Sequence, residues 1–406
     1  MTIKPEIVSP AGNPEKLRIA VRYGADAVYF GGEMLNLREN ADNFLFNDLA
    51  DGAAFCKENN VRSIFLLNSF LHENEIDDAR AYINSIKSIP FDAVMVSDPG
   101  MISLVQESGI GSEIHLSTQM STLNHLSISF WQKQGISRIV LARETTLDEI
   151  RMIRSHTDAD IEVFVHGALC VAYSGRCLLS RYMSGRDANK GNCSQPCRWN
   201  YRLVEEKRPG EYFDVIEDAK GTEILSSKDL CLIEKLPEFV KAGVNAFKIE
   251  GRMKSIYYVA NVTRIYKTAV QTILSGGDYS SSLPLWKEEL DLVSHRPFTE
   301  NLFNEFDGKF EPIPYVNKAT YFGYVVSSEP NDPMSEIKVG NPFKPDDELE
   351  AIFPPSDGKI VHDKVRVLEI FENGVLTDMA RPDRVLRVRF SSPLPAGAIL
   401  RKRTSL

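Results

Sequence analysis

The sequence lacks any apolar run of about 18 residues or more, the length that a membrane-spanning helix requires. The opening residues, Met1–Glu6, also lack the apolar stretch of a signal peptide. The motifs of zinc proteases, serine hydrolases and P-loop NTPases are absent, and so is the G-x-G-x-x-G loop of dinucleotide-binding folds. These absences predict a cytoplasmic protein without a membrane partner, and they leave the common hydrolase classes without a motif.

An excess of positive charge is also missing, because 56 Asp and Glu residues outnumber 47 Lys and Arg residues and give a net charge of −9. This balance excludes a protein that coats nucleic acid by charge alone. The stretch Val361–Leu406 differs, since it has nine basic residues against five acidic ones and closes with the triplet Arg401–Arg403. It is compatible with a module that contacts phosphates and, equally, with a solvated basic tail.

A repeated pattern occupies the first 275 residues, in which a helical stretch ends at a glycine and a short apolar strand follows. Gly24, Gly135 and Gly243 hold this position, where glycine tolerates the left-handed conformation that ends a helix. The strands begin near Glu6, Ala27, Arg62, Ala93, Glu113, Arg138, Ile161 and Ala246. Apolar and polar residues do not alternate steadily along these strands, as is typical of parallel strands that are buried on both faces. Eight such units predict an α/β fold, the (β/α)8 or TIM barrel, rather than a doubly wound sheet.

The connection between the seventh and eighth strands is far longer than an ordinary βα loop, which predicts a functional insertion at about 168–240. We expect the TIM barrel to occupy 1–280 and a helical linker to follow at 281–318. From 319 to 406, short β-rich runs alternate with Pro and Gly turns, which predicts a small C-terminal all-β barrel domain.

Polar residues crowd the carboxyl ends of the predicted strands, where the active site of a TIM barrel forms. At these ends lie Ser9, Gly31–Gly32, Asn68, Asp98, Ser117–Gln119, Arg143–Glu144, His166–Gly167 and Glu250–Arg252. The candidate catalytic residues are His166, Glu250, Arg252 and Arg143. His166 is placed for general acid–base catalysis or for a bond in the pocket floor, whereas Arg143 and Arg252 suit carboxylate or phosphate groups. Glu250 and Arg252 are alternatively a pair that closes the barrel, and Asp98 is a candidate helix cap.

Four of the six cysteines gather in the insertion, at Cys170, Cys177, Cys193 and Cys197. In a reducing compartment this grouping predicts metal ligands rather than disulfides. The first gap, six residues, is wider than the tight pairs of structural zinc sites, and four thiolates suit a [4Fe–4S] cluster. Zinc and ordinary buried cysteines stay open as alternatives. Cys231 competes as a ligand, but we expect it at the start of a helix, packed as a small apolar residue.

The stretch Glu162–Ser180, which reads EVFVHGALCVAYSGRCLLS, resembles the signature of peptidase family U32. Further matching segments are Ser9–Gly12, Gly24–Gly31, Gly191–Trp199, Ser227–Leu230, Lys248–Arg252 and Ser294–Arg296. The resemblance therefore covers essentially the whole chain, including the C-terminal β module that many members carry.

Within the family, the segments Glu206–Tyr212 and Lys228–Cys231 are most similar to the tRNA hydroxylation proteins. This resemblance implies oxygen-independent conversion of the wobble uridine of tRNA to 5-hydroxyuridine, with prephenate as co-substrate. It also implies that Cys170, Cys177, Cys193 and Cys197 hold the iron–sulfur cluster, and that a second family member is a possible partner. The alternatives are a collagenase-like peptidase and a non-catalytic protein that binds RNA or carries a cluster.

Overall fold

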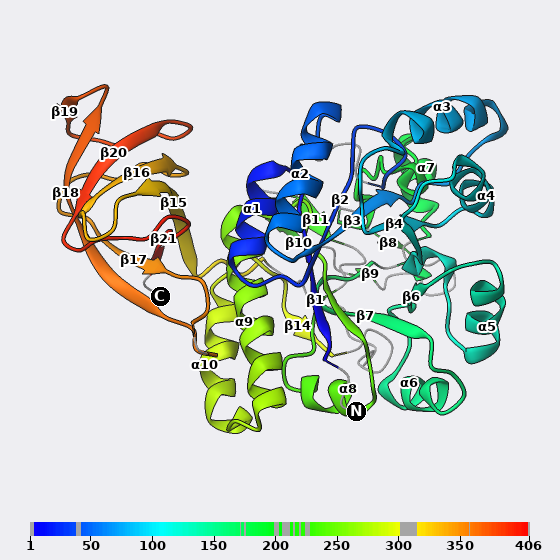
Figure 1. Ribbon diagram of the computed structural model, residues 1–406. Helices are drawn as coiled ribbons and strands as arrows, with labels where there is room; N and C mark the ends of the chain where they lie inside the picture. The colour runs from blue at the N-terminus through cyan, green and yellow to red at the C-terminus, as the bar shows by residue number, and fades with distance from the viewer. Residues whose placement is uncertain are drawn as a thin grey trace. The chain divides into compact units, whose positions relative to one another are not determined.

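The computed structural model describes residues 4–37, 42–170, 172–173, 176–198, 203–204, 212–213, 216–218, 221–223, 228–300, 315–356 and 358–404. The chain forms two compact units (Figure 1). Unit 1 consists of Met1–Leu17, Asp26–Met253 and Arg296–Tyr315. Unit 2 consists of Arg18–Ala25, Lys254–His295 and Val316–Leu406.

Eight parallel strands form a closed barrel in unit 1 (Figure 1). They are β1 (Glu6–Pro10), β2 (Ala27–Phe30), β3 (Arg62–Leu67), β4 (Ala93–Val96), β5 (Glu113–Leu116), β6 (Arg138–Val140), β7 (Asp160–Ala168) and β13 (Ala246–Ile249). The strands pair in this order, and β13 closes the barrel by pairing with both β7 and β1. This architecture confirms the TIM barrel, and each strand begins within one residue of its predicted start.

The barrel strands are short and almost wholly buried, which explains why their sequences do not alternate. The three glycines singled out in the sequence have positive φ angles of 96° at Gly24, 81° at Gly135 and 82° at Gly243. They end the helices before β2, β6 and β13, as the pattern predicted.

Helices follow the strands along the chain, as a (β/α)8 barrel requires. They are α1 (Pro14–Arg22), α2 (Phe46–Glu58), α3 (Ile76–Ile86), α4 (Pro99–Ser108), α5 (His125–Lys133), α6 (Leu147–Arg154), α8 (Leu236–Lys241) and α9 (Ile256–Ser275). Asp98 caps α4, because its Oδ1 accepts a hydrogen bond from the Met101 backbone N–H at 3.0 Å. None of the helices in the described ranges combines the length and the hydrophobicity that a membrane span needs.

The insertion between β7 and β13 adds elements to the barrel sheet. It contains α7 (Leu179–Ser184) and the two-stranded pairs of β8 (Leu203–Val204) with β9 (Tyr212–Phe213) and of β10 (Ile216–Asp218) with β11 (Gly221–Glu223). Strand β12 (Asp229–Cys231) then pairs antiparallel with β7, and β14 (Phe298–Thr299) pairs parallel with β12. Cys231 therefore lies in a strand and not at the start of a helix, because its backbone is held opposite His166 of β7.

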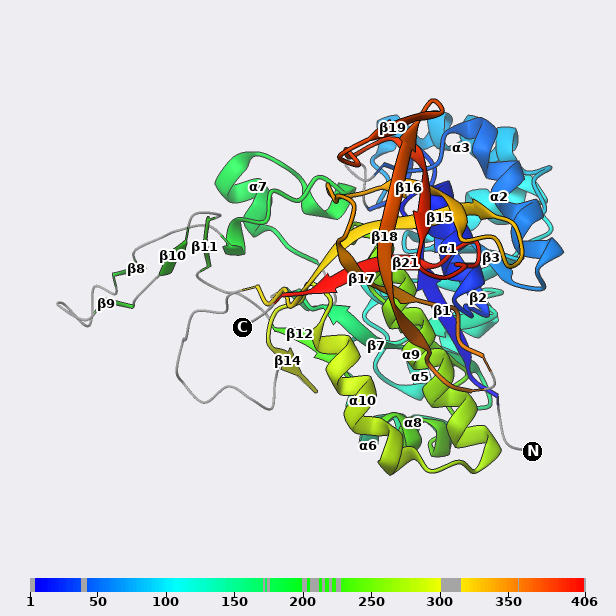
Figure 2. The ribbon, with the colours of Figure 1, turned by 90° about the vertical axis from the view of Figure 1, so that its left-hand side faces the viewer.

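Unit 2 contains a second, antiparallel barrel of six strands, which confirms the predicted C-terminal all-β barrel (Figure 2). Its strands are β15 (Ala319–Ser328), β16 (Met334–Val339), β17 (Glu348–Ile352), β18 (His362–Glu372), β20 (Val385–Phe390) and β21 (Ile399–Arg403). Pairing of β17 with both β18 and β21 closes the barrel, and β19 (Val375–Thr377) extends β18 as a hairpin. Side chains such as Val325, Ile337 and Phe390 fill its interior.

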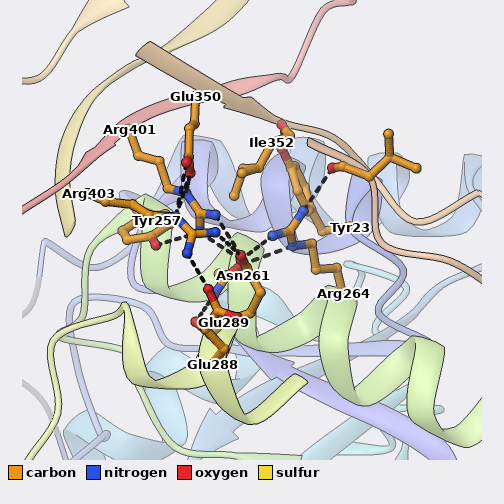
Figure 3. Close-up of polar contacts among 11 residues, drawn as sticks. Tyr23, Tyr257, Asn261, Arg264, Glu288, Glu289, Glu350, Ile352, Arg401 and Arg403 are labelled. Atoms are coloured by element: carbon orange, nitrogen blue, oxygen red, sulfur yellow. Dashed lines mark hydrogen bonds and ion pairs between the residues drawn. The ribbon is translucent and has the colours of Figure 1, made fainter. Parts of the chain in front are cut away.

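A buried ion cluster in unit 2 accounts for part of the basic C-terminal triplet (Figure 3). Arg401 donates two hydrogen bonds of 2.7 Å to the Glu289 carboxylate of α10 (Tyr279–Asp291), and Arg264 of α9 donates a third at 2.7 Å. All three side chains are fully buried. Burial opposes ionisation of Glu289, but the bonds from Arg401 and the charge of Arg264 hold its pKa below the ordinary value.

The two other members of the triplet are also paired. Arg403 contacts Glu288 and Glu350, and Lys402 lies 3.8 Å from Asp347. The triplet is therefore not a free basic tail, because its charges are compensated within unit 2.

Candidate active site and cysteine loop

The carboxyl end of the unit 1 barrel is lined by buried polar side chains. Ser97 donates a hydrogen bond of 3.0 Å to the Gln119 side chain, which links the ends of β4 and β5. Asn68, at the end of β3, is buried, and within the described part of the chain its Oδ1 has no hydrogen-bond partner. An unpaired buried acceptor of this kind is costly unless a ligand or water satisfies it. The barrel mouth therefore has the character of a polar binding site.

Arg143 and Glu250, two of the predicted site residues, lie together at this mouth. Nη2 of Arg143 is 3.3 Å from the Glu250 carboxylate, and Nη1 donates a hydrogen bond of 2.9 Å to the Ala168 carbonyl. The guanidinium also lies 4.0 Å above the Phe164 ring centroid, in a cation–π contact. Three contacts therefore fix the Arg143 side chain between β6, β7 and the end of β13.

A buried ion pair lies beneath these residues and was not singled out from the sequence. Nζ of Lys248 is 2.7 Å from the Glu162 carboxylate and 4.3 Å from the Tyr29 ring centroid. Burial lowers the pKa of Lys248, while Lys248 and Arg138 hold the pKa of Glu162 down against the effect of burial. The sequence did contain an indication of this pair, because Glu162 and Lys248 are charged residues within short, otherwise apolar strands.

Arg252 lies against the segment that follows β2 rather than beside Arg143. Its guanidinium donates hydrogen bonds to the side-chain oxygens of Asn36, at 3.0 Å, and Asn43. Gly31 permits this close approach, since a Cβ there would lie 2.8 Å from Arg252 Nη2. The side chain is 3% exposed, so its position is fixed from several sides.

His166 is fully enclosed near the end of β7. Its ring lies 5.4 Å from the Phe298 ring, and its carbonyl accepts a hydrogen bond of 2.8 Å from the Glu250 backbone N–H. The structure thus brings His166, Arg143 and Glu250 to one part of the mouth and places Arg252 in another.

The cysteine loop, residues 170–198, is anchored on segments at the carboxyl ends of barrel strands. Arg176 donates a hydrogen bond of 2.6 Å to the Gln119 carbonyl, just beyond β5, and lies 5.3 Å from the Phe70 ring, beyond β3. Lys190 contacts the Glu75 carboxylate. The described part of the loop therefore lies at the carboxyl end of the barrel.

Two of the cysteine sulfurs accept hydrogen bonds from the backbone. The Ala172 and Gln195 backbone N–H groups donate to the sulfurs of Cys170, at 3.4 Å, and Cys193, at 3.3 Å. Burial raises the pKa of the Cys170 thiol, and the charges of Cys177 and Cys193 raise this pKa further. The hydrogen bond from Ala172 and the charge of Arg143 lower the same pKa, but by less. In the part of the chain that the structure describes, no three His, Cys, Asp or Glu side chains are arranged to hold a single metal ion.

A second arginine contacts the backbone before Cys170. Arg296 forms a buried ion pair of 2.7 Å with Asp229 of β12, and its Nη2 donates a hydrogen bond of 3.4 Å to the Leu169 carbonyl. Arg143 and Arg296 therefore contact two successive carbonyls, those of Ala168 and Leu169, directly before the first clustered cysteine.

Comparison with known proteins places these features in a family. The family model of peptidase family U32 matches residues 12–310. The chain is 37% identical to tRNA hydroxylation protein P1 of Bacillus subtilis (strain 168), over 99% of this chain and 96% of that protein. It is 35% identical to a collagenase of Porphyromonas gingivalis, over 73% of each chain. It is 39% identical to the 23S rRNA 5-hydroxycytidine synthase of Escherichia coli (strain K12), over 66% of this chain and 40% of that protein.

Both the extent of the family match and the identity over nearly the full length lead to one conclusion: this chain belongs to peptidase family U32.

Proposed function

We propose that this chain modifies RNA by hydroxylation, converting the wobble uridine of tRNA to 5-hydroxyuridine without molecular oxygen. Prephenate is the proposed co-substrate, and a [4Fe–4S] cluster is the proposed cofactor. Relatives named for tRNA hydroxylation and for rRNA 5-hydroxycytidine synthesis support the reaction class, because both names describe hydroxylation of RNA.

The single observation that carries the proposal is the position of Arg143. Its guanidinium pairs with Glu250 at the barrel mouth and donates a hydrogen bond of 2.9 Å to the Ala168 carbonyl, two residues before Cys170. The cysteine loop and the polar mouth are therefore adjacent parts of one site, as a redox reaction on a bound base requires.

The chemistry of the donor set fits a thiolate centre. The loop supplies four cysteines, and the sulfurs of Cys170 and Cys193 accept backbone N–H bonds of the kind that tune iron–sulfur centres. Cys170, Cys177, Cys193 and Cys197 are the proposed ligands. Bound there, a cluster would supply one-electron transfer next to the mouth.

The protein's own residues would bind the substrates and move the proton. A nucleobase must leave its stack to reach the mouth. Replacing its C5–H by C5–OH would take the oxygen atom from water and release two protons and two electrons, for which the keto group of prephenate is the proposed acceptor. The step also requires a base for the C5 proton. Glu250 is the candidate base and His166 the candidate relay. Arg143 and Arg252 are the candidate contacts for the prephenate carboxylates.

Mass spectrometry of tRNA nucleosides from a strain that lacks the gene tests this function. We expect 5-hydroxyuridine to be lost and to return with the wild-type gene. Unchanged 5-hydroxyuridine would refute the proposal and, if the purified chain still bound tRNA, would favour a non-catalytic RNA-binding protein. Cleavage of gelatin by the purified protein, abolished by a point change that leaves it folded, would favour the peptidase function suggested by the collagenase relative.

A further inference from the structure

We infer that α7 and the turn after it form a contact surface for single-stranded RNA, called here the α7 surface (Leu178, Arg181, Tyr182, Met183 and Arg186). The inference rests on the proposed function and deepens it, because it names the part of the chain that holds the RNA strand.

Large apolar and aromatic side chains of this surface are open to solvent. Tyr182 is 86% exposed, Leu178 is 73% exposed and Met183 is 39% exposed. Leu178 directly precedes α7 and Tyr182 lies four residues further on, within the helix, where its backbone N–H donates to the Leu178 carbonyl at 3.0 Å; the two residues therefore lie on the same face. An exposed ring of this kind offers a platform on which an unstacked base can lie.

The charge of the segment suits a phosphate backbone. Residues 176–198 contain five Lys or Arg residues and one Asp, in a chain whose net charge is −9. Arg181 is 65% exposed and meets Asp187 only at 3.5 Å, and Nε of Arg186 donates to the Asn192 side chain at 2.7 Å. An exposed ion pair such as that of Arg181 with Asp187 is weak. The Arg181 guanidinium is therefore available to a phosphate.

Serine contacts hold the surface beside the cysteines. The Ser194 backbone N–H donates to Ser180 Oγ at 3.0 Å, and the hydroxyls of Ser184 and Ser194 are 2.6 Å apart. Because Ser194 directly follows Cys193, α7 is fixed to the segment that carries a proposed ligand. Figure 2 shows α7 projecting from the rest of unit 1.

The combination of exposed ring and cations favours RNA over a protein partner. The other basic candidate, Arg401–Arg403, has its charges compensated by carboxylates of its own unit. The α7 surface instead presents an aromatic side chain and guanidinium groups next to the proposed reaction centre, which is the arrangement that single-stranded nucleic acid requires.

Fluorescence anisotropy with labelled, unfractionated tRNA from a strain that lacks the gene tests this inference, using the full chain purified without oxygen. We expect Tyr182→Ala to weaken binding about tenfold, because one stacked base is lost. We expect Arg181→Ala with Arg186→Ala to lower the slope of log affinity against log salt by roughly 1 to 2. The matched controls are Tyr315→Ala, which is 46% exposed in the wild type, and Arg381→Ala with Arg387→Ala, two exposed arginines of unit 2.

Weaker binding in the α7 variants alone, with unchanged melting temperature, would support the inference. Unchanged binding in these variants, or equal weakening in the controls, would overturn it. Loss of a co-purifying protein with RNA binding intact would overturn it in favour of a protein-docking surface. If the wild-type gene restores 5-hydroxyuridine and Tyr182→Ala binds tRNA normally, this inference alone fails; if the wild type neither modifies nor binds tRNA, the proposed function fails with it.

Discussion

Arg296 and Asp229 form a buried ion pair of 2.7 Å that joins two segments 67 residues apart and reaches the backbone before the first clustered cysteine. Each side chain is 1% exposed. Because Arg296 also contacts the Leu169 carbonyl, the pair links strand β12 to the start of the cysteine loop.

We expect Arg296→Lys to lower the iron content of the anaerobically purified protein while the fold is retained. Lysine keeps the positive charge that Asp229 requires. It lacks the planar guanidinium group, which contacts the Asp229 carboxylate and the Leu169 carbonyl at the same time. Iron analysis with circular dichroism would check this, and Arg151→Lys, in an exposed pair with Glu238, is the control. Full iron content with a lower melting temperature would show that the pair has a purely structural role.

The Glu289 cluster predicts a pH-dependent contribution to stability. Glu289→Gln removes the carboxylate between two buried guanidinium groups, so we expect a loss of about 3–5 kcal/mol in the free energy of unfolding at pH 7. Because the pKa of Glu289 is lower in the folded state, its contribution is present above the unfolded value of about 4.3 and is lost as the pH falls through the folded value. The difference between wild type and variant should therefore shrink below about pH 4.

Urea unfolding across pH would measure this difference without adding salt. Glu288→Gln is the matched control, because its side chain is 53% exposed and its pair with Arg403 is worth about 0–1 kcal/mol. A Glu289→Gln difference that stayed constant down to pH 2, or an equal loss in the control, would contradict the assignment.

The Lys248–Glu162 pair predicts a strong coupling in the barrel interior. Lys248→Met leaves a buried carboxylate without its nearest cation, and we expect a loss of about 3–5 kcal/mol. Adding Glu162→Gln should recover part of this loss, because the double variant has no uncompensated charge there. Urea unfolding of both single variants and the double variant would measure the coupling; strictly additive losses would argue against it.

The sequence predicted most of the unit 1 barrel, because its strands are local apolar segments and several of them follow a glycine that ends the preceding helix. It also placed Arg143, Glu250 and His166 at the mouth, since strand ends in a closed parallel barrel meet there. Strand β12 escaped prediction, because three residues carry no reliable pattern and its partners β7 and β14 are distant in the chain.

The tertiary partners of charged residues could not be predicted in the same way. Arg401–Arg403 reads as a basic tail in the sequence, yet Arg401 is fully buried against Glu289, more than a hundred residues away. The pairing of Asp229 with Arg296 was equally hidden, although both residues lie in segments that carry the family resemblance. Local composition reports charge, whereas only the fold determines which charges are compensated.

Iron and acid-labile sulfide in the anaerobically purified protein test the central claim most directly. We predict about four of each per chain in the wild type and in Cys231→Ser, and a marked loss in variants with serine at Cys170, Cys177, Cys193 or Cys197. Zinc in place of iron, or iron and sulfide that persist when all four cysteines are serine, would contradict the account.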